Sequence, residues 1–450
     1  MSARPSHPFT VTSRDVWAIA LPAAFAFITE PLVGFTDITV VGRLGDAALL
    51  GGLVLGALVF DFIFSLAYFL RIGTAGLTAQ SVGAHDPDHG LLHAARALLV
   101  AIVAGIGMVV LAIPLLWLAE LALAPGGAVR EALATYFHIR IWSAPFVLIN
   151  YVMLGWFYGR ADARTGMLLQ LLLHGVKIIS TIGLVFWLHW GVAGAAIGTV
   201  VGEIAAAGLG LALFARHFGG LRAILTRIER KALTDAAAIG RLVSLNRDLM
   251  IRSASLMGAY AWFAAQGSRM GEVMLSANAI LLNLLMIVAF FLDGVAQAAE
   301  QLCGRAYGAN WRPAFDRAYA LSFGAGLVIS VGLGALWYLG GDWVIGLMTT
   351  NEAVRAAAHD YLWIAALCAL TFTPAFLYDG ILIGITLNGE MRNGMVASLV
   401  VFLAAAWALQ MLLGNIGLWL ALHVWFIARG AYYWWALQRR RAGLFTEAAA

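Results

Sequence analysis

The sequence predicts an all-α integral membrane protein in which twelve transmembrane helices form two six-helix bundles of repeated sequence. Hydrophobic residues make up 62% of the 450 residues and charged residues only 12%, with a mean hydropathy of +0.86. Such a chain has too few polar residues to cover a soluble globule of this length. Apolar stretches of about 20 residues, enough to span a hydrocarbon core of about 30 Å as a helix, recur along nearly the whole chain.

Two sets of residues recur about half a chain apart. The stretch Arg43-Leu-Gly-Asp46 returns as Arg269-Met-Gly-Glu272, 226 residues later. The second set returns 221 residues later, with Gly73, Ala75, Gln80, Gly83 and Arg96 corresponding to Gly294, Ala296, Gln301, Gly304 and Arg317. Duplicated apolar bundles are typical of secondary transporters, which bind their substrate between the two halves. Transport is therefore the first functional hypothesis.

Each predicted span lies on an apolar window long enough to cross a bilayer. In chain order the spans are 17–42, 50–80, 95–118, 133–158, 166–188, 191–214, 242–265, 273–303, 317–339, 356–385, 394–413 and 416–437. The first six form a lobe at 1–217, a connecting loop follows at 218–240, and the last six form a lobe at 241–450. Because six is even, the second lobe keeps the orientation of the first, so the axis relating the two runs along the membrane normal.

The distribution of positive charge predicts the orientation of the chain. An even number of spans puts both termini on one side, and 18 of the 28 Lys and Arg residues fall on that side with four opposite. By the positive-inside rule both termini are cytoplasmic, and we expect the chain in the cytoplasmic (inner) membrane of a bacterium. The same asymmetry accounts for the net charge of +4 without a nucleic-acid partner, since the charges are spread over many short loops.

The first span carries two acids and a proline. Glu30 and Asp37 are seven residues apart and share a helical face, and Pro31 between them permits a bend because it removes a backbone hydrogen bond. An ionised side chain at bilayer depth costs about 2.5–3.5 kcal/mol and usually faces a cavity, pairs, or carries ions. We expect Glu30 and Asp37 to couple transport to an ion, with protonation of Asp37 switching the bend. The alternative is that Asp37 has only a structural role and pairs with a neighbouring cation.

The fifth span places His174, Lys177 and Thr181 on one face, since they are spaced i, i+3 and i+7. Together with Asn150 of the fourth span, they are candidates to line a substrate cleft. Lys177 either pairs with Asp37 or extends its ammonium into a water-filled cavity. Pairing would oppose the effect of burial on Asp37, so the preferred protonation state of Asp37 stays open. In the sixth span, glycines recurring between 191 and 202 predict close packing of a neighbouring helix.

The second half carries its own polar network, which we expect to gate or stabilise that lobe rather than to form a second proton site. Its members are Asn246, Asp248, Arg252, Asp293, Glu300 and Asp379. Within the seventh span, Asp248 and Arg252 are spaced as an i, i+4 pair. In the eighth span, Gln297 and Gln301 extend the network into a polar stripe.

Two other classes of protein compete with a transporter. An integral-membrane enzyme would draw on a polar loop that contains His85, Asp86, Asp88, His89 and His93. A solvated loop readily carries such residues, and no third anchoring motif accompanies them, so we expect neither an enzyme nor a metal site. An ion channel is disfavoured because the lobes lack a repeated filter-like loop. Neither lysine lies in a phosphate-binding G-x-x-x-x-G-K-[ST] loop, so transport would run on an ion gradient.

Four motifs give the chain a family resemblance. They are Asp37-Ile-Thr-Val-Val-Gly-Arg-Leu-Gly45, Asn246-Arg-Asp-Leu-Met-Ile-Arg252, Asp293-Gly-Val-Ala-Gln-Ala-Ala-Glu300 and Asp379-Gly-Ile-Leu-Ile-Gly384. In this order they resemble the MATE (multidrug and toxic compound extrusion) family, and most of all its DNA-damage-inducible F branch. The resemblance covers essentially the whole chain. It implies the MATE fold of two six-helix lobes around a central cleft, antiport of protons or sodium, and export of bulky, often cationic amphiphiles. In the family pattern, the first-helix acid matched by Asp37 is the protonation and coupling residue.

The chain departs from the family pattern in the fifth span, where many relatives carry Asn and Asp and this chain has Lys177 and Thr181. The exchange removes an acid from the first lobe and adds a base. We expect a monomeric antiporter, surrounded by membrane lipids, that exports amphiphilic small molecules by alternating access. It would use no cofactor, with H⁺ or else Na⁺ as the coupling ion and Asp37 as proton carrier. A lipid or lipid-linked oligosaccharide flippase is the alternative transporter, which Lys177 keeps open.

Overall fold

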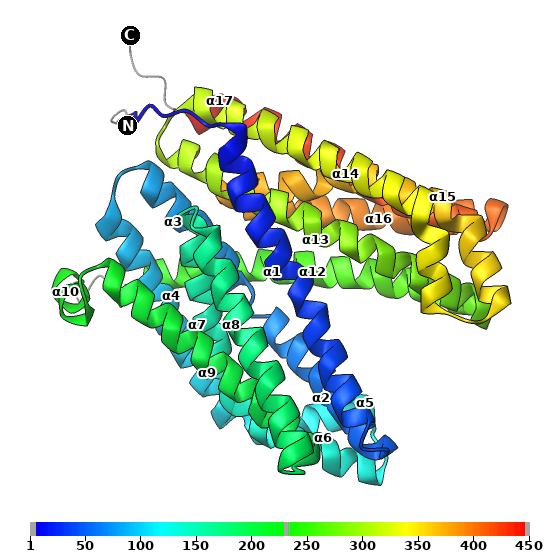
Figure 1. The fold of residues 1–450 in the computed structure, drawn as a ribbon. Coiled ribbons are helices and arrows are strands. Elements are labelled where there is room, and N and C mark those ends of the chain that lie inside the picture. The colour runs from blue at the N-terminus through cyan, green and yellow to red at the C-terminus, as the bar shows by residue number, and fades with distance from the viewer. Residues whose placement is uncertain (1–5, 229–232, 234, 446–450) are drawn as a thin grey trace. The chain divides into compact units, whose positions relative to one another are not determined.

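The computed structural model describes residues 6–228, 233 and 235–445, with the backbone alone at 236–239, 241–246 and 442. All the regular structure in these residues is helical (Figure 1). The predicted all-α membrane fold of twelve spanning helices is confirmed.

Several of the first six predicted spans consist of two consecutive helical pieces. The helices are α1 Ser13–Gly42, α2 Ala47–Ser65, α3 Phe69–Gly83, α4 Pro87–Val110, α5 Ala112–Leu123, α6 Gly127–Arg140, α7 Ala144–Gly159, α8 Ala163–Ile182 and α9 Gly191–His217. A 3₁₀ turn at Ile141–Ser143 joins α6 to α7, and a π turn at Gly183–Trp187 extends α8.

Proline explains two of these interruptions. Pro114 has no N–H to bond the carbonyl of Val110, and α4 ends at Val110. Pro145 likewise cannot bond the carbonyl of Ile141, where the 3₁₀ turn begins. Pro31 behaves differently, because α1 stays helical through it to Gly42.

The second half of the chain consists of long helices. They are α12 Ala236–Arg269, α13 Glu272–Gly308, α14 Arg312–Met348, α15 Glu352–Gly384, α16 Asn388–Leu413 and α17 Asn415–Leu444. A short helix, α10 Leu221–Arg227, lies within the predicted connecting loop.

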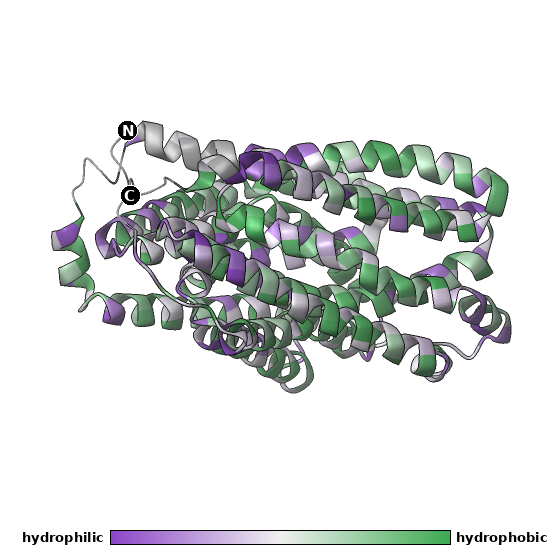
Figure 2. Ribbon diagram, turned by 90° about the horizontal axis from the view of Figure 1, so that it is seen from above, coloured by the Kyte–Doolittle hydropathy of each residue, from purple (hydrophilic) through white to green (hydrophobic). Residues whose placement is uncertain are grey.

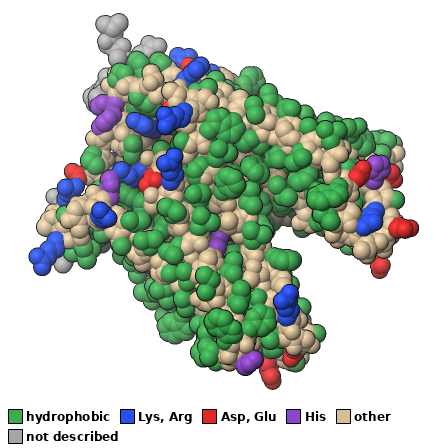
Figure 3. Space-filling view, in the orientation of Figure 1, with side chains coloured by type: hydrophobic (Ala, Val, Ile, Leu, Met, Phe, Trp, Pro, Cys, Tyr) green, Lys and Arg blue, Asp and Glu red, His purple; other side chains and the backbone are tan. Residues whose placement is uncertain are grey.

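The surface of the helices suits a lipid environment. Ten helical stretches of the described chain are long and apolar enough to cross a membrane, while α12 and α17 are long enough but more polar. Large apolar side chains such as Trp187 and Leu339 are each 82% exposed. Figure 2 shows apolar residues on many of the helices, and Figure 3 shows many hydrophobic side chains on the visible face with charged ones mainly near helix ends. Lipid tails would cover this apolar surface as water cannot.

Contacts divide the chain into two compact units. The N-terminal unit comprises Ile28–Ser81 and Asp86–Asn246, and the C-terminal unit comprises Met1–Phe27, Val82–His85 and Arg247–Ala450. The boundary falls inside helix α1, so one continuous helix contributes its first half to the C-terminal unit and its second half to the N-terminal unit. The lobes predicted at 1–217 and 241–450 stay a prediction.

The C-terminal unit is built around α13 and α15, whose backbones approach closely. A Cβ atom added to Gly380 would lie 2.1 Å from the carbonyl oxygen of Ala296, and one added to Gly384 would lie 2.2 Å from that of Glu300. Small residues spaced i, i+4 on α15 therefore allow this contact. It places Asp379 and Glu300, two of the predicted network residues, on helices that touch.

Candidate functional site

A buried ion pair joins helices α1 and α8 inside the N-terminal unit. Oδ2 of Asp37 lies 2.8 Å from Nζ of Lys177, and each residue is 7% exposed. The sequence left two placements open for Lys177, and in the structure Lys177 pairs with Asp37. Because this charge-assisted contact is short and buried, it connects the two helices strongly.

The same face of α8 carries the other two predicted residues. His174 and Thr181 are buried like Lys177, as the i, i+3, i+7 spacing predicts. Nδ1 of His174 lies 2.8 Å from Oγ1 of Thr29, so α1 and α8 share a second polar contact. Thr181 is fully buried, and its hydroxyl has no hydrogen-bond partner among the described residues.

Two further charged residues, Arg140 and Glu203, lie near the buried ion pair in the N-terminal unit. Nδ2 of Asn150 donates to Oε2 of Glu203 at 2.6 Å and to the backbone carbonyl of Glu203 at 3.1 Å. Nη1 of Arg140 donates to the hydroxyl of Tyr136 at 2.6 Å. Lys177 lies within electrostatic reach of Asp37, Arg140 and Glu203. Two cations and two carboxylates therefore offset one another, which lowers the cost of burying them.

Arg140 and Glu203 fall inside predicted spans but are not among the predicted site residues. Each is an ionisable residue inside an apolar span, and that signal alone singles out a functional candidate. Glu30 and Asp37 are seven residues apart on one helix and are expected to share a face, but their surroundings differ. Glu30 is exposed in the N-terminal unit, and its electrostatic neighbours are Arg71 and Asp61.

The centre of the C-terminal unit is an acid between two arginines. Oδ2 of Asp379 accepts a hydrogen bond from Nη2 of Arg252 at 2.6 Å and lies 3.6 Å from Nη2 of Arg429. Arg429 is 2% exposed, and its guanidinium lies over the Phe426 ring at 4.8 Å. The predicted Asp248–Arg252 pair is therefore wrong, because Arg252 turns to a more buried acid on another helix.

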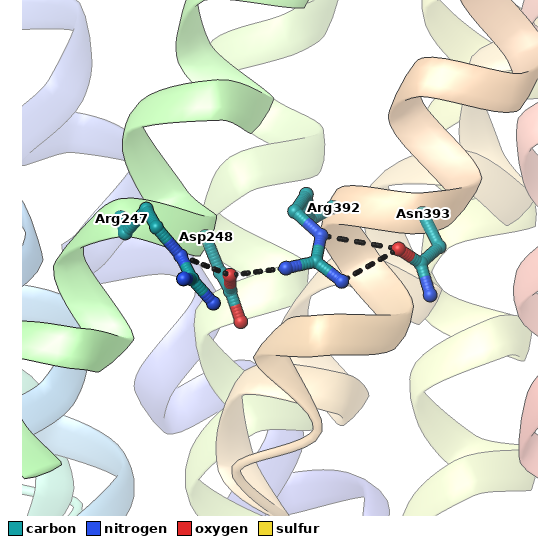
Figure 4. Close-up of polar contacts among 4 residues, drawn as sticks. All are labelled: Arg247, Asp248, Arg392 and Asn393. Atoms are coloured by element: carbon teal, nitrogen blue, oxygen red, sulfur yellow. Dashed lines mark hydrogen bonds and ion pairs between the residues drawn. The ribbon is translucent and has the colours of Figure 1, made fainter.

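Asp248 instead belongs to a cluster between α12 and α16 (Figure 4). Its Oδ1 lies 2.7 Å from Nη1 of Arg392 and 3.6 Å from Nε of Arg247. Arg392 also donates from Nε and Nη2 to Oδ1 of Asn393, at 3.1 and 2.9 Å. The neighbouring side chain of Asn246 lies outside the described part of the structure.

The polar stripe on α13 is held together internally. Nε2 of Gln297 donates to Oε2 of Glu300 at 3.0 Å, and both residues are buried. Asp293 lies within electrostatic reach of Arg252 and so adds a second acid near the Asp379 cluster. The predicted network is thus divided among three local groups of contacts.

The predicted polar loop is only partly a loop, because Asp88, His89 and His93 lie in helix α4, whereas His85 and Asp86 precede it. Nε2 of His89 lies 3.1 Å from Nε2 of His93, and Asp86 uses its Oδ1 to cap the backbone N–H of His89. No group of three or more His, Cys, Asp or Glu side chains in the described chain converges as metal ligands do. The carboxylate of Asp86 instead accepts a hydrogen bond at the start of α4, an ordinary helix cap.

Spanning helices in two sequence repeats, with charged groups buried inside, define a multi-span membrane transporter. A sequence model of the MatE family matches residues 22–182 and again 250–409. These matches start 228 residues apart, in agreement with the internal repeat. The chain therefore belongs to the MATE family, which the four motifs resemble.

Individual relatives agree with this membership. DNA damage-inducible protein F of Escherichia coli is 36% identical over 94% of this chain and 91% of its own length. The multidrug export protein MepA of Staphylococcus aureus is 20% identical over 85% of this chain and 83% of its own. Among solved structures, a MATE protein in the straight conformation has a TM-score of 0.85 at 19% identity, covering 96% of both chains. A MOP superfamily transporter from Pyrococcus furiosus has a TM-score of 0.83 at 18% identity, covering 97% and 99%.

Proposed function

We propose that this MATE transporter is a secondary antiporter that exports amphiphilic small molecules in exchange for protons by alternating access. The name of its relative MepA, a multidrug export protein, supports the direction and the kind of cargo. The observation that carries the proposal is the buried pair of Asp37 and Lys177. Both residues lie in the N-terminal unit, and Asp37 is on the helix that continues into the C-terminal unit.

The pair turns protonation into a conformational choice. A proton on Asp37 removes the negative charge, so Lys177 becomes a buried cation without its partner. Removing one partner of a buried pair costs about 3–5 kcal/mol. The protein therefore favours an arrangement in which Lys177 finds water or a substrate group once Asp37 is protonated. Two discrete arrangements that depend on a bound proton are what coupling requires.

The available driving force matches this cost. One elementary charge crossing the membrane gains about 2.3 kcal/mol per 100 mV, so a potential of about 150 mV supplies about 3.5 kcal/mol. That is the same order as the cost of separating the pair. A single proton per cycle would thus supply free energy comparable to this cost.

The pair also favours a proton over sodium as the coupling ion. The ammonium of Lys177 already occupies Oδ2 of Asp37 at 2.8 Å. A sodium ion would have to displace this ammonium and then bear its repulsion at close range. A proton neutralises the carboxylate without needing a coordination shell. The sodium alternative therefore meets a larger electrostatic barrier.

The remaining features of the proposed transporter concern its setting. We place it in the cytoplasmic membrane of a bacterium with both termini cytoplasmic, acting as a monomer without cofactor. The runner-up function, a lipid or lipid-linked oligosaccharide flippase, would be favoured by a strongly cationic cleft. In the N-terminal unit, carboxylates lie within electrostatic reach of the buried cations Lys177 and Arg140. The buried charges of this unit therefore do not favour the flippase.

Dye efflux from proteoliposomes under an imposed pH gradient tests the proposal. Asp37→Asn should abolish efflux driven by the gradient, whereas Asp342→Asn, at an exposed ion pair with His359, should leave it unchanged. Undiminished efflux by Asp37→Asn would reject Asp37 as the proton carrier. Replacing the pH gradient by a sodium gradient tests the ion, and a fluorescent-lipid flipping assay in the same vesicles tests the flippase.

A further inference from the structure

Helices α12 and α16 run side by side and parallel in the C-terminal unit. Near one end, Arg392 donates to Asp248 at 2.7 Å, and near the other, Gln410 donates to Gln266 at 3.3 Å. Both pairs join residues 144 positions apart in sequence. The two helices therefore keep a single register over 18 residues, which is about 27 Å of helix.

A groove opens between these helices beside the cluster drawn in Figure 4. Its volume is about 600 Å³, and its lining consists of Arg247, Ile251, Arg392, Asn393, Val396 and Ala397. The polar members lie one helical turn from the apolar ones on each helix. Ile251 is 37% exposed and Val396 is 40% exposed, so the apolar part faces outward. The groove thus has a charged end and an apolar end.

Helix length places the charged end at a membrane–water interface. Arg269, the last residue of α12, is 22 residues beyond Arg247, or about 33 Å along the helix. That length is close to the thickness of a hydrocarbon core, about 30 Å. Arg247 and Arg269 then mark the two interfaces. Ile251 and Val396 lie about one turn deeper, where acyl chains begin.

The charges of the cluster do not cancel. Arg247 and Arg392 share one carboxylate, that of Asp248. Arg392 uses Nε, Nη1 and Nη2 in hydrogen bonds to Asp248 and Asn393. The side chain of Arg247 is 72% exposed and reaches Asp248 only through Nε at 3.6 Å. Among the described residues, none accepts a hydrogen bond from Arg247, so its guanidinium is available for an external anion.

We propose that this groove binds an anionic phospholipid. The lipid phosphate would accept hydrogen bonds from Arg247, with the positive charge of Arg392 behind it, and an acyl chain would lie over Ile251 and Val396. A guanidinium binds phosphate well because its donors match the phosphate oxygens. The apolar end explains why the ligand is a lipid rather than free phosphate, since free phosphate would leave that end empty. Bound there, the lipid would bridge α12 and α16.

Native mass spectrometry of the full chain in detergent tests this site. The protein is titrated with phosphatidylglycerol and with phosphatidylcholine of identical acyl chains, for the wild type and for Arg247→Gln. Each arginine near a membrane surface contributes about 1 kcal/mol toward anionic lipid, so the preference for phosphatidylglycerol should fall about fivefold in Arg247→Gln. Arg439→Gln is the matched control, because it removes an exposed arginine that stacks on Trp435 and does not line the groove.

The outcomes separate a specific site from general charge attraction. A loss of preference in Arg247→Gln with retention in Arg439→Gln supports the groove. An equal loss in both variants overturns it, as does a wild type that binds the two lipids equally. Inorganic phosphate at millimolar concentration should leave the bound lipid in place, and complete displacement by phosphate would overturn the lipid as the ligand. Arg247→Gln changes an exposed side chain, so its thermal unfolding should match that of the wild type.

Discussion

Nζ of Lys177 lies 2.8 Å from Oδ2 of Asp37, and the two side chains are only 8% and 10% exposed. Neither group can change its charge independently in such surroundings, because a lone ion at bilayer depth is costly. A change in the charge of Asp37 on α1 would therefore act directly on Lys177 of α8. Its contribution to stability and its contribution to transport can be measured separately.

A double-mutant cycle at this pair should show strong coupling. Asp37→Asn and Lys177→Met each leave one buried charge behind, so each should lower the free energy of unfolding by about 3–5 kcal/mol. The double variant removes both charges and should be more stable than either single variant. Unfolding of the purified protein in detergent measures all four free energies. Additive losses would show that the two side chains do not interact.

The two acid clusters of the C-terminal unit should respond differently to the same substitution. Asp379→Asn leaves the buried Arg429 and the part-buried Arg252 without their carboxylate, at a cost of about 3–5 kcal/mol. Asp248→Asn affects partners that are 28% and 72% exposed, so water replaces the lost contact and the cost should be about 1 kcal/mol or less. The comparison uses denaturation midpoints of both variants. Equal shifts would mean that burial does not decide the strength of these pairs.

The repeat supplies a matched pair of glycines for a packing test. A Cβ atom at Gly294 would lie 2.5 Å from the carbonyl oxygen of Ala20, whereas at the corresponding Gly73 it would meet nothing within 4 Å. Gly294→Ala should therefore destabilise the protein by about 1–3 kcal/mol through separation of α1 and α13. Gly73→Ala should be neutral or stabilising by up to about 1 kcal/mol, since alanine favours helix. Thermal unfolding in detergent compares the two, and a stable Gly294→Ala would argue against the close contact.

The fold was predictable because apolar length and periodicity decide where helices form in a membrane. Proline explains interruptions that apolar windows alone pass over, as at Pro114 and Pro145. Yet Pro31 does not end α1, so proline by itself does not say which helix breaks. The neighbouring helices determine whether the freed carbonyl finds another partner, and a single sequence does not contain that information.

Within the candidate site, local spacing predicted shared faces but not partners. The spacing of His174, Lys177 and Thr181 correctly put them on one buried face of α8. The i, i+4 rule failed for Asp248 and Arg252, because Asp379, 127 residues from Arg252, is more buried and needs a cation more. Tertiary burial thus outweighs local spacing. Pairing across such distances depends on how helices pack.

Lys177 should also set the charge preference of the transporter. With Lys177 present, a cationic dye must compete with an ammonium already bound to Asp37. Lys177→Asn frees the carboxylate and removes a repelling charge. We expect the ratio of cationic to anionic dye efflux to rise about tenfold, equivalent to about 1.4 kcal/mol of altered electrostatic interaction. Efflux of paired dyes from the same proteoliposomes measures the ratio, with Arg439→Gln as a charge-matched control. An unchanged ratio would mean that the dyes never approach the pair, and Asp37 would then act on the proton alone.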